Sequence, residues 1–425
     1  MLEDERIVKA RKKNMKLYPI YRMLGSDIIF LYAIKMLFLT QVKGINPQDV
    51  VMSLSMYALF MIILQLPITS LIEKIGYRKS AFISNVFNVI YITLLMCSTN
   101  IWWLIIAEFT SAISFSLKDV AEPSLLNASI PETEKRGNIY SKLEGKGSAK
   151  YNFLNGMANI ITGVLYMVNP YLPMISSLSC ALIACILSLQ FKEINQKTEK
   201  ITIKKYMNDL KISFQFIFYS KRLKSLLIYS GLIWGVHCLA SEYKDTLLVE
   251  IGTSALLIGI IGAVLEVVAS IASKKQGKFH NRFTNKSLSY IAISFAIGII
   301  ITGGIALCNI PFTIELIVIV IAFGIETADK SMSLILINRY LANFSNQEIL
   351  PKIYSANSMV KNFLRMIIGI LGSILMARTS TASAMTIVGI VLLIVVIGLL
   401  KAMKTRVGLK PEEYQKEEIE CSRIH

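Results

Sequence analysis

Long runs of apolar residues, separated by short polar segments, make up most of this chain. A helix needs roughly 20 apolar residues to cross the ~30 Å hydrocarbon core of a membrane at about 1.5 Å per residue. The runs predict twelve membrane-spanning helices, near residues 17–42, 48–72, 80–98, 102–128, 149–168, 173–191, 223–243, 255–273, 288–307, 312–338, 354–377 and 382–402. We therefore expect an all-α integral membrane protein.

A repeat within the chain indicates two similar halves. Asp119 lies beside a lysine inside one apolar run and Asn152 opens the next, and Asp329 and Asn362 follow in the same order. Both matching pairs are 210 residues apart, which predicts two pseudo-symmetric six-helix bundles. The predicted parts are a cytoplasmic basic tail 1–16, an N-terminal bundle 17–191, a basic cytoplasmic loop 192–222, a C-terminal bundle 223–402 and a cytoplasmic tail 403–425.

The charge of the chain fits a membrane protein better than a nucleic-acid-binding protein. The chain has 54% hydrophobic residues and 45 Lys and Arg against 28 Asp and Glu. The basic residues collect in both tails, in the central segment and in alternate loops, such as 74–79, 135–146 and 274–282. By the positive-inside bias both termini are cytoplasmic, where these residues face anionic lipids. We expect a multi-pass protein of the cell membrane with no nucleic-acid partner, and the high Lys, Ile and Asn usage suggests a bacterial inner membrane.

The sequence offers no constellation for catalysis or metal binding. Its three histidines are scattered and its six cysteines lack a metal-ligand spacing. The segment 144–148 resembles a phosphate-binding loop but lacks the full spacing and a preceding strand. We therefore expect a protein that is not an enzyme and needs no cofactor or metal.

Several charged residues lie inside the apolar runs. A charge at the bilayer centre costs about 2.5 kcal/mol or more, so such residues are candidates for function. The residues expected to bind substrate or couple protons are Asp27, Lys35, Lys118, Asp119, Glu122, Glu326, Asp329 and Lys330. Glu108, Glu266 and Glu315 are further charges in these runs.

Helical spacing separates these charges into pairs and single acids. Lys118 and Glu122 are four residues apart, as are Glu326 and Lys330, so each pair is expected to meet on one helical face. Asp119 and Asp329 are left over, and because burial disfavours a charged carboxylate, each could take up and release a proton. We predict that these two acids, with Asp27, couple transport to protons. Their similar depth equally suits a charge network that closes the cytoplasmic side, and both readings stay open.

The loop after the second run carries a family signature. The sequence from Glu73 to Lys79, EKIGYRK, resembles the loop signature of the major facilitator superfamily. It departs from that pattern in Glu73, where aspartate is usual, and in Thr69, where glycine is usual. The resemblance implies a twelve-helix transporter whose halves rock about a central cavity lined by helices 1, 4, 7 and 10, and a monomer is usual for the family.

The same resemblance implies a gate at the cytoplasmic side. Its expected residues are Glu73, Lys74, Gly76, Arg78 and Lys79 in the loop, with Lys361 and Arg365 near the start of helix 11 as partners. Glycine permits the tight turn, and the charges could exchange partners as the halves rock.

These observations favour a secondary active transporter of a small polar or charged organic solute that works by alternating access and is driven by protons. The alternative is a lipid flippase or amphipathic drug exporter on the same fold. The residues that could line the apolar half of its cavity are Tyr21, Phe30, Trp234, Phe323 and Met332. A receptor or a membrane enzyme is a third class, which the lack of a catalytic constellation disfavours.

Overall fold

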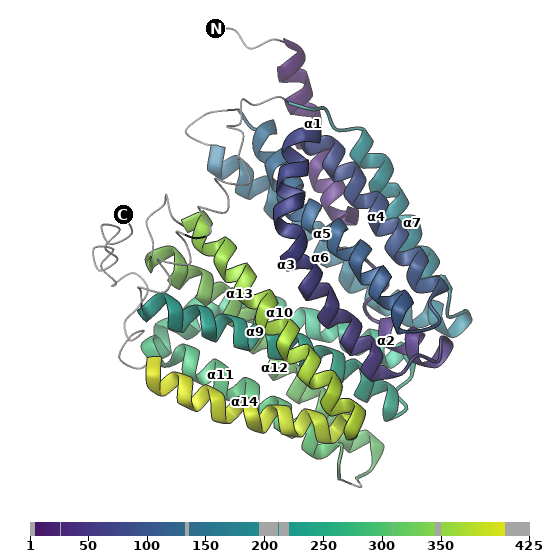
Figure 1. Cartoon of the computed structure of the whole chain (residues 1–425), viewed down its shortest axis with the longest axis vertical. Coiled ribbons are helices and arrows are strands. Elements are labelled where there is room, and N and C mark those ends of the chain that lie inside the picture. Colours follow the sequence, from purple (N-terminus) through teal and green to yellow (C-terminus); the bar gives the residue numbers. More distant parts are fainter. Residues whose placement is uncertain are drawn as a thin grey trace. The chain divides into compact units, whose positions relative to one another are not determined.

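The computed structural model describes residues 5–25, 27–131, 136–194, 211, 221–308, 310–344 and 350–403. Regular structure in these ranges is helical throughout (Figure 1). The elements are α1 (Glu5–Gly25), α2 (Lys35–Leu37), the π-helical turn η1 (Phe38–Val42), α3 (Pro47–Ile75), α4 (Tyr77–Cys97), α5 (Ile101–Ser129), α6 (Arg136–Val168), α7 (Leu172–Leu189), α9 (Lys221–Glu250), α10 (Ala255–Phe283), the 3₁₀ turn η2 (Thr284–Lys286), α11 (Ser287–Ile305), α12 (Phe312–Phe344), α13 (Leu350–Arg378) and α14 (Thr381–Met403). The predicted all-α fold is confirmed.

Nine helices in the described ranges are long and apolar enough to cross a membrane, namely α3, α4, α5, α7, α9, α10, α11, α13 and α14. The other three predicted spans fall on α1 and α2, which are separate helices, on the polar α6, and on α12, which carries charged residues in its middle. The count of twelve crossings therefore stays a prediction.

Two compact units divide the chain. Unit 1 comprises Met1–Asn46, Phe60–Ile203 and Thr253–Ala263, and unit 2 comprises Pro47–Leu59, Lys204–Gly252 and Val264–His425. The first part of α3 thus belongs to unit 2 and the first part of α10 to unit 1. The domain boundaries drawn from the sequence at residues 191 and 223 stay predictions.

The same packing pattern occurs in both units. In unit 1, α4 packs against α5 and α7, and α1 packs against α5, α6 and α7. In unit 2, α11 packs against α12 and α14, and α9 packs against α12, α13 and α14. Asp119 lies in α5 and Asp329 in α12, which hold matching places in this pattern. The pseudo-symmetry predicted from the 210-residue repeat is confirmed.

The first predicted helix is interrupted, so the prediction of one continuous helix over residues 17–42 is wrong. α1 ends at Gly25 and α2 begins at Lys35, and Phe30 between them has a positive φ of 69°. An unsatisfied backbone group costs several kcal/mol in lipid, so the unwound segment needs partners. Ser177 of α7 donates to the Ile29 carbonyl at 2.6 Å, and Thr162 of α6 donates to the Phe30 carbonyl at 3.3 Å.

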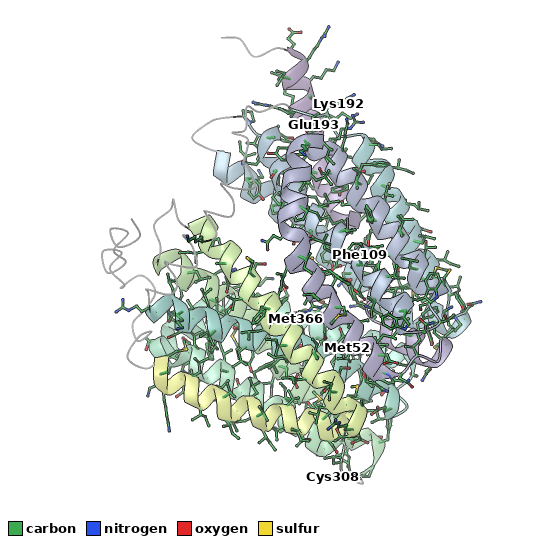
Figure 2. All side chains as sticks on the ribbon, in the orientation of Figure 1. Met52, Phe109, Lys192, Glu193, Cys308 and Met366 are labelled. Atoms are coloured by element: carbon green, nitrogen blue, oxygen red, sulfur yellow. The ribbon has the colours of Figure 1, made fainter. Side chains whose placement is uncertain are left out.

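The signature loop turns at Gly76 and is held by an acid from a distant part of the chain. Gly76 has a φ of 87°, and a Cβ on it would lie 2.9 Å from a carboxylate oxygen of Glu193. That carboxylate accepts the backbone N–H groups of Tyr77 and Arg78, each at 3.0 Å, and so caps the start of α4. The Arg78 guanidinium donates to the Leu189 carbonyl at 2.8 Å. Figure 2 labels Glu193, which follows α7 in the chain.

Gly76→Ala is expected to destabilise unit 1 by about 1–3 kcal/mol, because alanine disfavours positive φ and its Cβ meets the Glu193 carboxylate. Gly44→Ala is the matched control, since Gly44 has a φ of 66° and nothing within 4 Å of the added Cβ. Thermal unfolding in detergent should rank Gly76→Ala as the more damaging change. Equal losses in the two variants would contradict the close approach of Glu193.

Candidate functional site

A buried polar network joins four helices of unit 1. Glu122 of α5 accepts from the Tyr21 hydroxyl at 2.6 Å and from the Arg22 guanidinium at 3.1 Å. The same guanidinium reaches Glu144 of α6 at 3.2 Å, and Asn85 of α4 donates to the Tyr21 hydroxyl at 2.8 Å. Arg22 therefore bridges two carboxylates, one of which is fully buried. Sequence reasoning missed Arg22, although its place just inside an apolar run was a usable signal.

Lys118 and Glu122 lie within electrostatic range of each other, as the spacing predicts, but they form no direct hydrogen bond. Glu122 is bound by Tyr21 and Arg22, and among the described residues the Lys118 ammonium has no hydrogen-bond partner. It lies 5.2 Å from the centre of the Phe115 ring. The cation in direct contact with Glu122 therefore comes from a neighbouring helix, and Lys118 acts on it from a longer distance.

A second buried ion pair fixes the chain where the first helix resumes. The Lys35 ammonium lies 2.8 Å from the Glu108 carboxylate of α5 and 3.0 Å from the Tyr91 hydroxyl of α4. The side chains of Lys35 and Glu108 are 7% and 2% exposed, so the pair is cut off from solvent. This contact holds Lys35 in a structural role in this conformation, and its predicted role in substrate binding stays untested.

Two predicted acids of unit 1 lie outside these ion pairs. Asp27, in the break of the first helix, accepts the Ile28 backbone N–H at 2.9 Å and lies within electrostatic range of Lys118. Asp119 is exposed, although its neighbour Lys118 is buried. Asp119 and Lys118 therefore point to different sides of α5, as the roughly 100° turn per residue predicts.

The acids of α12 in unit 2 face α11. Ser294 donates to the Asp329 carboxylate at 2.7 Å, and Thr302 donates to the Glu326 carboxylate at 3.2 Å. Gly298 lies between these two residues of α11, and a Cβ on it would meet Glu326 at 3.0 Å. Residues 294, 298 and 302 are four apart, so they form one face of α11. Hydroxyl groups therefore solvate both acids.

Lys330 makes no contact with these acids, so the predicted pairing of Glu326 with Lys330 is wrong in its geometry. The Lys330 ammonium lies 5.8 Å from the centre of the Trp234 ring of α9, and the Lys361 ammonium of α13 lies 5.5 Å from the same ring. Neither lysine makes an ion pair within the described part of the chain, although Glu266 lies within electrostatic range of Lys330.

Further aromatic and cationic groups of unit 2 surround this tryptophan. The His237 ring lies 6.2 Å from Trp234 and 6.2 Å from Phe295, centre to centre. Its Nδ1 atom is buried with no hydrogen-bond partner among the described residues. Arg365 lies 5.0 Å from the centre of the Tyr57 ring. We call Trp234, His237, Lys330 and Lys361 the cation–indole cluster.

The predicted gate stays a prediction. Lys74 and Lys79 are exposed and Arg78 is bound to the Leu189 carbonyl, but the Glu73 side chain lies outside the described residues. Lys361 and Arg365 belong to unit 2, where they lie against Trp234 and Tyr57. Within the described ranges, no group of three or more His, Cys, Asp or Glu residues is arranged to hold a metal ion.

Comparisons with known proteins place this architecture among transporters. The family model of the Major Facilitator Superfamily matches residues 23–328. A folate-like transporter of Dictyostelium discoideum is 24% identical over 335 residues, which are 77% of this chain and 54% of that protein. The chain thus spans about half the length of this curated relative.

Solved transporter structures share the fold. The nucleoside transporter NupG has a TM-score of 0.70 at 11% identity, over 96% of this chain and 100% of that chain. An inward-facing bacterial homologue of the human lysosomal transporter Spinster has a TM-score of 0.67 at 15% identity, over 93% of this chain and 98% of that chain. At these identities the likeness shows the fold alone.

The Lys35–Glu108 pair generates a stability prediction. Glu108→Gln leaves the buried ammonium without a countercharge and is expected to lower the unfolding free energy by about 3–5 kcal/mol. The double variant Lys35→Met/Glu108→Leu removes both charges and is expected to recover most of this loss. Thermal unfolding of the three proteins in detergent measures the effect. A double variant as unstable as Glu108→Gln would show that the pair is not the cause.

Proposed function

The chain belongs to the Major Facilitator Superfamily, and we propose that it is a proton-coupled secondary active transporter of a small organic anion that carries an aromatic ring. The family and fold support solute transport by a membrane protein. The nature of the solute is inferred from the cation–indole cluster, and the coupling from the acids of α5 and α12.

The observation that carries the proposal is the pair of ammonium groups on one indole ring. Lys330 and Lys361 are both partly buried and come from different helices, α12 and α13. Neither ammonium group makes an ion pair among the described residues, and a partly buried charge without one is costly. Cation–π contacts of about 0.5–2 kcal/mol offset only part of this cost. An anionic solute would supply the missing countercharge.

The cluster also offers surfaces for a flat ring. Trp234 and His237 of α9 are aromatic side chains whose ring centres lie 6.2 Å apart, and the Nδ1 atom of His237, which has no partner among the described residues, could exchange a hydrogen bond with a heterocycle. The names of the relatives agree with this chemistry, since folate and nucleosides both contain aromatic heterocycles and folate is an anion. A solute whose carboxylates contact Lys330 and Lys361 and whose ring contacts Trp234 and His237 would therefore interact with every residue of the cluster.

The acids of α12 are suited to proton exchange because hydroxyls bind them. Ser294 donates to Asp329 when the carboxylate is charged, and the same hydroxyl could accept from a protonated carboxyl group. Thr302 stands in the same relation to Glu326. In either protonation state the carboxyl group keeps its hydrogen bond to the hydroxyl. Protonation and deprotonation of Asp329 and Glu326 therefore break no hydrogen bond. Asp119, which is exposed on unit 1, is the matching candidate in the other half.

The alternative of a lipid or amphipathic drug exporter has less support. Tyr21 and Phe323, two of the residues proposed for its apolar half-cavity, are 0% and 1% exposed and pack inside their units. Trp234 is associated with two cations rather than with an apolar wall. This alternative remains an outcome of the experiments below.

The double variant Lys330→Gln/Lys361→Gln tests the anion site. Binding stabilises the folded protein by RT ln(1 + [L]/Kd), so aromatic mono- and dicarboxylates should raise the unfolding temperature of the wild type. The variant should bind them at least about tenfold more weakly, since two charge-assisted contacts are lost. The control is Lys274→Gln/Lys275→Gln, which removes two exposed lysines of α10. Stabilisation by neutral solutes or by lipids alone would contradict the proposal.

The coupling acids are tested in proteoliposomes. Asp329→Asn and Asp119→Asn are each expected to lower uptake driven by a pH gradient at least about tenfold, because an amide binds no proton at neutral pH. Exchange of labelled for unlabelled solute at equal pH needs no net proton movement and should be largely kept. Ser294→Ala serves as a partial variant that removes only the hydroxyl on Asp329. Full gradient-driven uptake in both asparagine variants would refute this assignment.

A further inference from the structure

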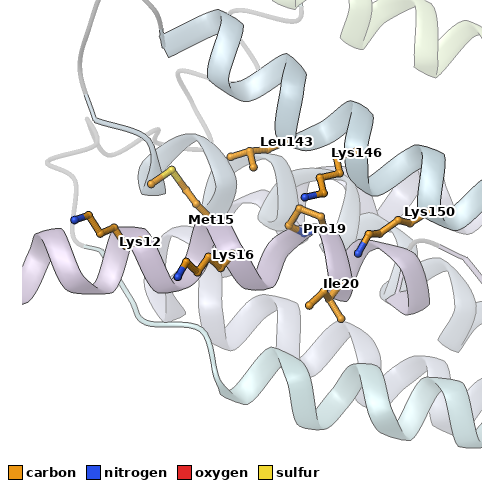
Figure 3. A pocket seen from close by; sticks show the side chains of 8 residues that line it. All are labelled: Lys12, Met15, Lys16, Pro19, Ile20, Leu143, Lys146 and Lys150. Atoms are coloured by element: carbon orange, nitrogen blue, oxygen red, sulfur yellow. The ribbon is translucent and has the colours of Figure 1, made fainter.

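A cavity of about 370 Å³ lies between α1 and α6 in unit 1. Its lining residues are different from those of the polar network around Glu122, which lies next to it. Its lining residues within the described ranges are Lys12, Met15, Lys16, Pro19, Ile20, Leu143, Lys146 and Lys150, of which four are lysines and none is an acid (Figure 3).

The sequence places these lysines by simple helical spacing. Lys12 and Lys16 are four residues apart on α1, and Lys146 and Lys150 are four apart on α6, so each pair shares one face of its helix. Gly147 lets the two helices approach, since a Cβ there would lie 2.8 Å from the Arg22 side chain. Two lysine pairs from two helices are thereby brought to one cavity.

The nearby acid does not neutralise these lysines. Glu144 follows a cavity residue on α6, but its carboxylate is bound by the Arg22 guanidinium at 3.2 Å and the Tyr18 hydroxyl at 2.7 Å. None of the four lysines makes an ion pair within the described ranges. Among the described residues the cavity is therefore lined by four positive charges without an ion-pair partner, which favours an anion bearing more than one negative oxygen.

The rest of the lining indicates what the anion is attached to. Met15, Pro19, Ile20 and Leu143 form an apolar wall, and Ile20 is 43% exposed. Four ammonium groups cannot lie in hydrocarbon, so the cavity belongs at the membrane–water boundary, where lipid phosphates lie. An amphiphile with a phosphate at the lysines and an acyl chain along the Ile20 side would satisfy both parts of the lining.

We propose that the α1–α6 cavity binds the phosphate-bearing headgroup of an anionic phospholipid. Such a lipid would tie α1 to α6 just before the break at which the first helix unwinds. The lipid site does not depend on the proposed solute or on proton coupling, so it can be tested independently of both.

A lipid titration of the purified full chain in detergent tests the site. Short-chain phosphatidylglycerol should raise the unfolding temperature of the wild type, whereas short-chain phosphatidylcholine and soluble glycerol phosphate should not. The quadruple variant Lys12→Gln/Lys16→Gln/Lys146→Gln/Lys150→Gln should need at least about tenfold more phosphatidylglycerol for the same shift. The control variant changes Lys274, Lys275, Lys278 and Lys286 to Gln, four exposed lysines of unit 2, and removes the same charge.

Each outcome decides the proposal. Equal loss of response in both quadruple variants would overturn the site, because net charge alone would explain the response. Stabilisation by glycerol phosphate as strong as that by phosphatidylglycerol would overturn the lipid assignment, and no response to either would overturn the binding. Should the quadruple variant fail to fold, the single changes Lys146→Glu and Lys278→Glu make the same comparison, and only the first should weaken the response.

Discussion

A charge or a free backbone group inside an apolar helix is costly unless it has a partner within the protein, and much of the polar structure of unit 1 follows from that constraint. In unit 1 it is met by ion pairs between helices. Lys35 is held by Glu108, and Arg22 bridges Glu122 and Glu144. These contacts join the early part of the chain to α5 and α6, so the polar groups specify which helices pack together. Van der Waals packing of the apolar side chains adds to the association of the helices but contributes little of this selectivity.

The break in the first helix depends on the same constraint. An unwound segment at membrane depth is tolerated where neighbouring side chains bind its backbone, as Ser177 and Thr162 do here. Discontinuous helices of this kind mark solute sites in many transporters. The break places Asp27 near Lys118, whereas the matching helix of unit 2, α9, runs without interruption from Lys221 to Glu250. The two halves therefore share packing but differ in this polar feature.

Hydropathy and the repeat were enough to predict the helical fold and its pseudo-symmetry, because both rest on residue spacing along the chain. The pairing of charges was not predictable in the same way. Spacing brings Glu122 toward Lys118, yet the guanidinium of Arg22 and the hydroxyl of Tyr21 reach it from another helix. Glu193 caps α4 from more than a hundred residues away in sequence, and no local sequence pattern predicts that contact. Spacing along one helix does not show which side chains of other helices will lie next to it, so these contacts could be identified only in the folded structure.

The unequal distribution of charge between the units bears on transport. Unit 1 satisfies Arg22 and Lys35 with carboxylates of its own, whereas Lys330 and Lys361 of unit 2 share one indole ring. An anion bound there would offset charge that has no ion-pair partner among the described residues. Protonation of Asp329 at the same time would remove a negative charge nearby, so the loaded unit would present little net charge to the membrane interior. Binding and proton uptake would then favour the same conformational change, which is the requirement for coupling two solutes.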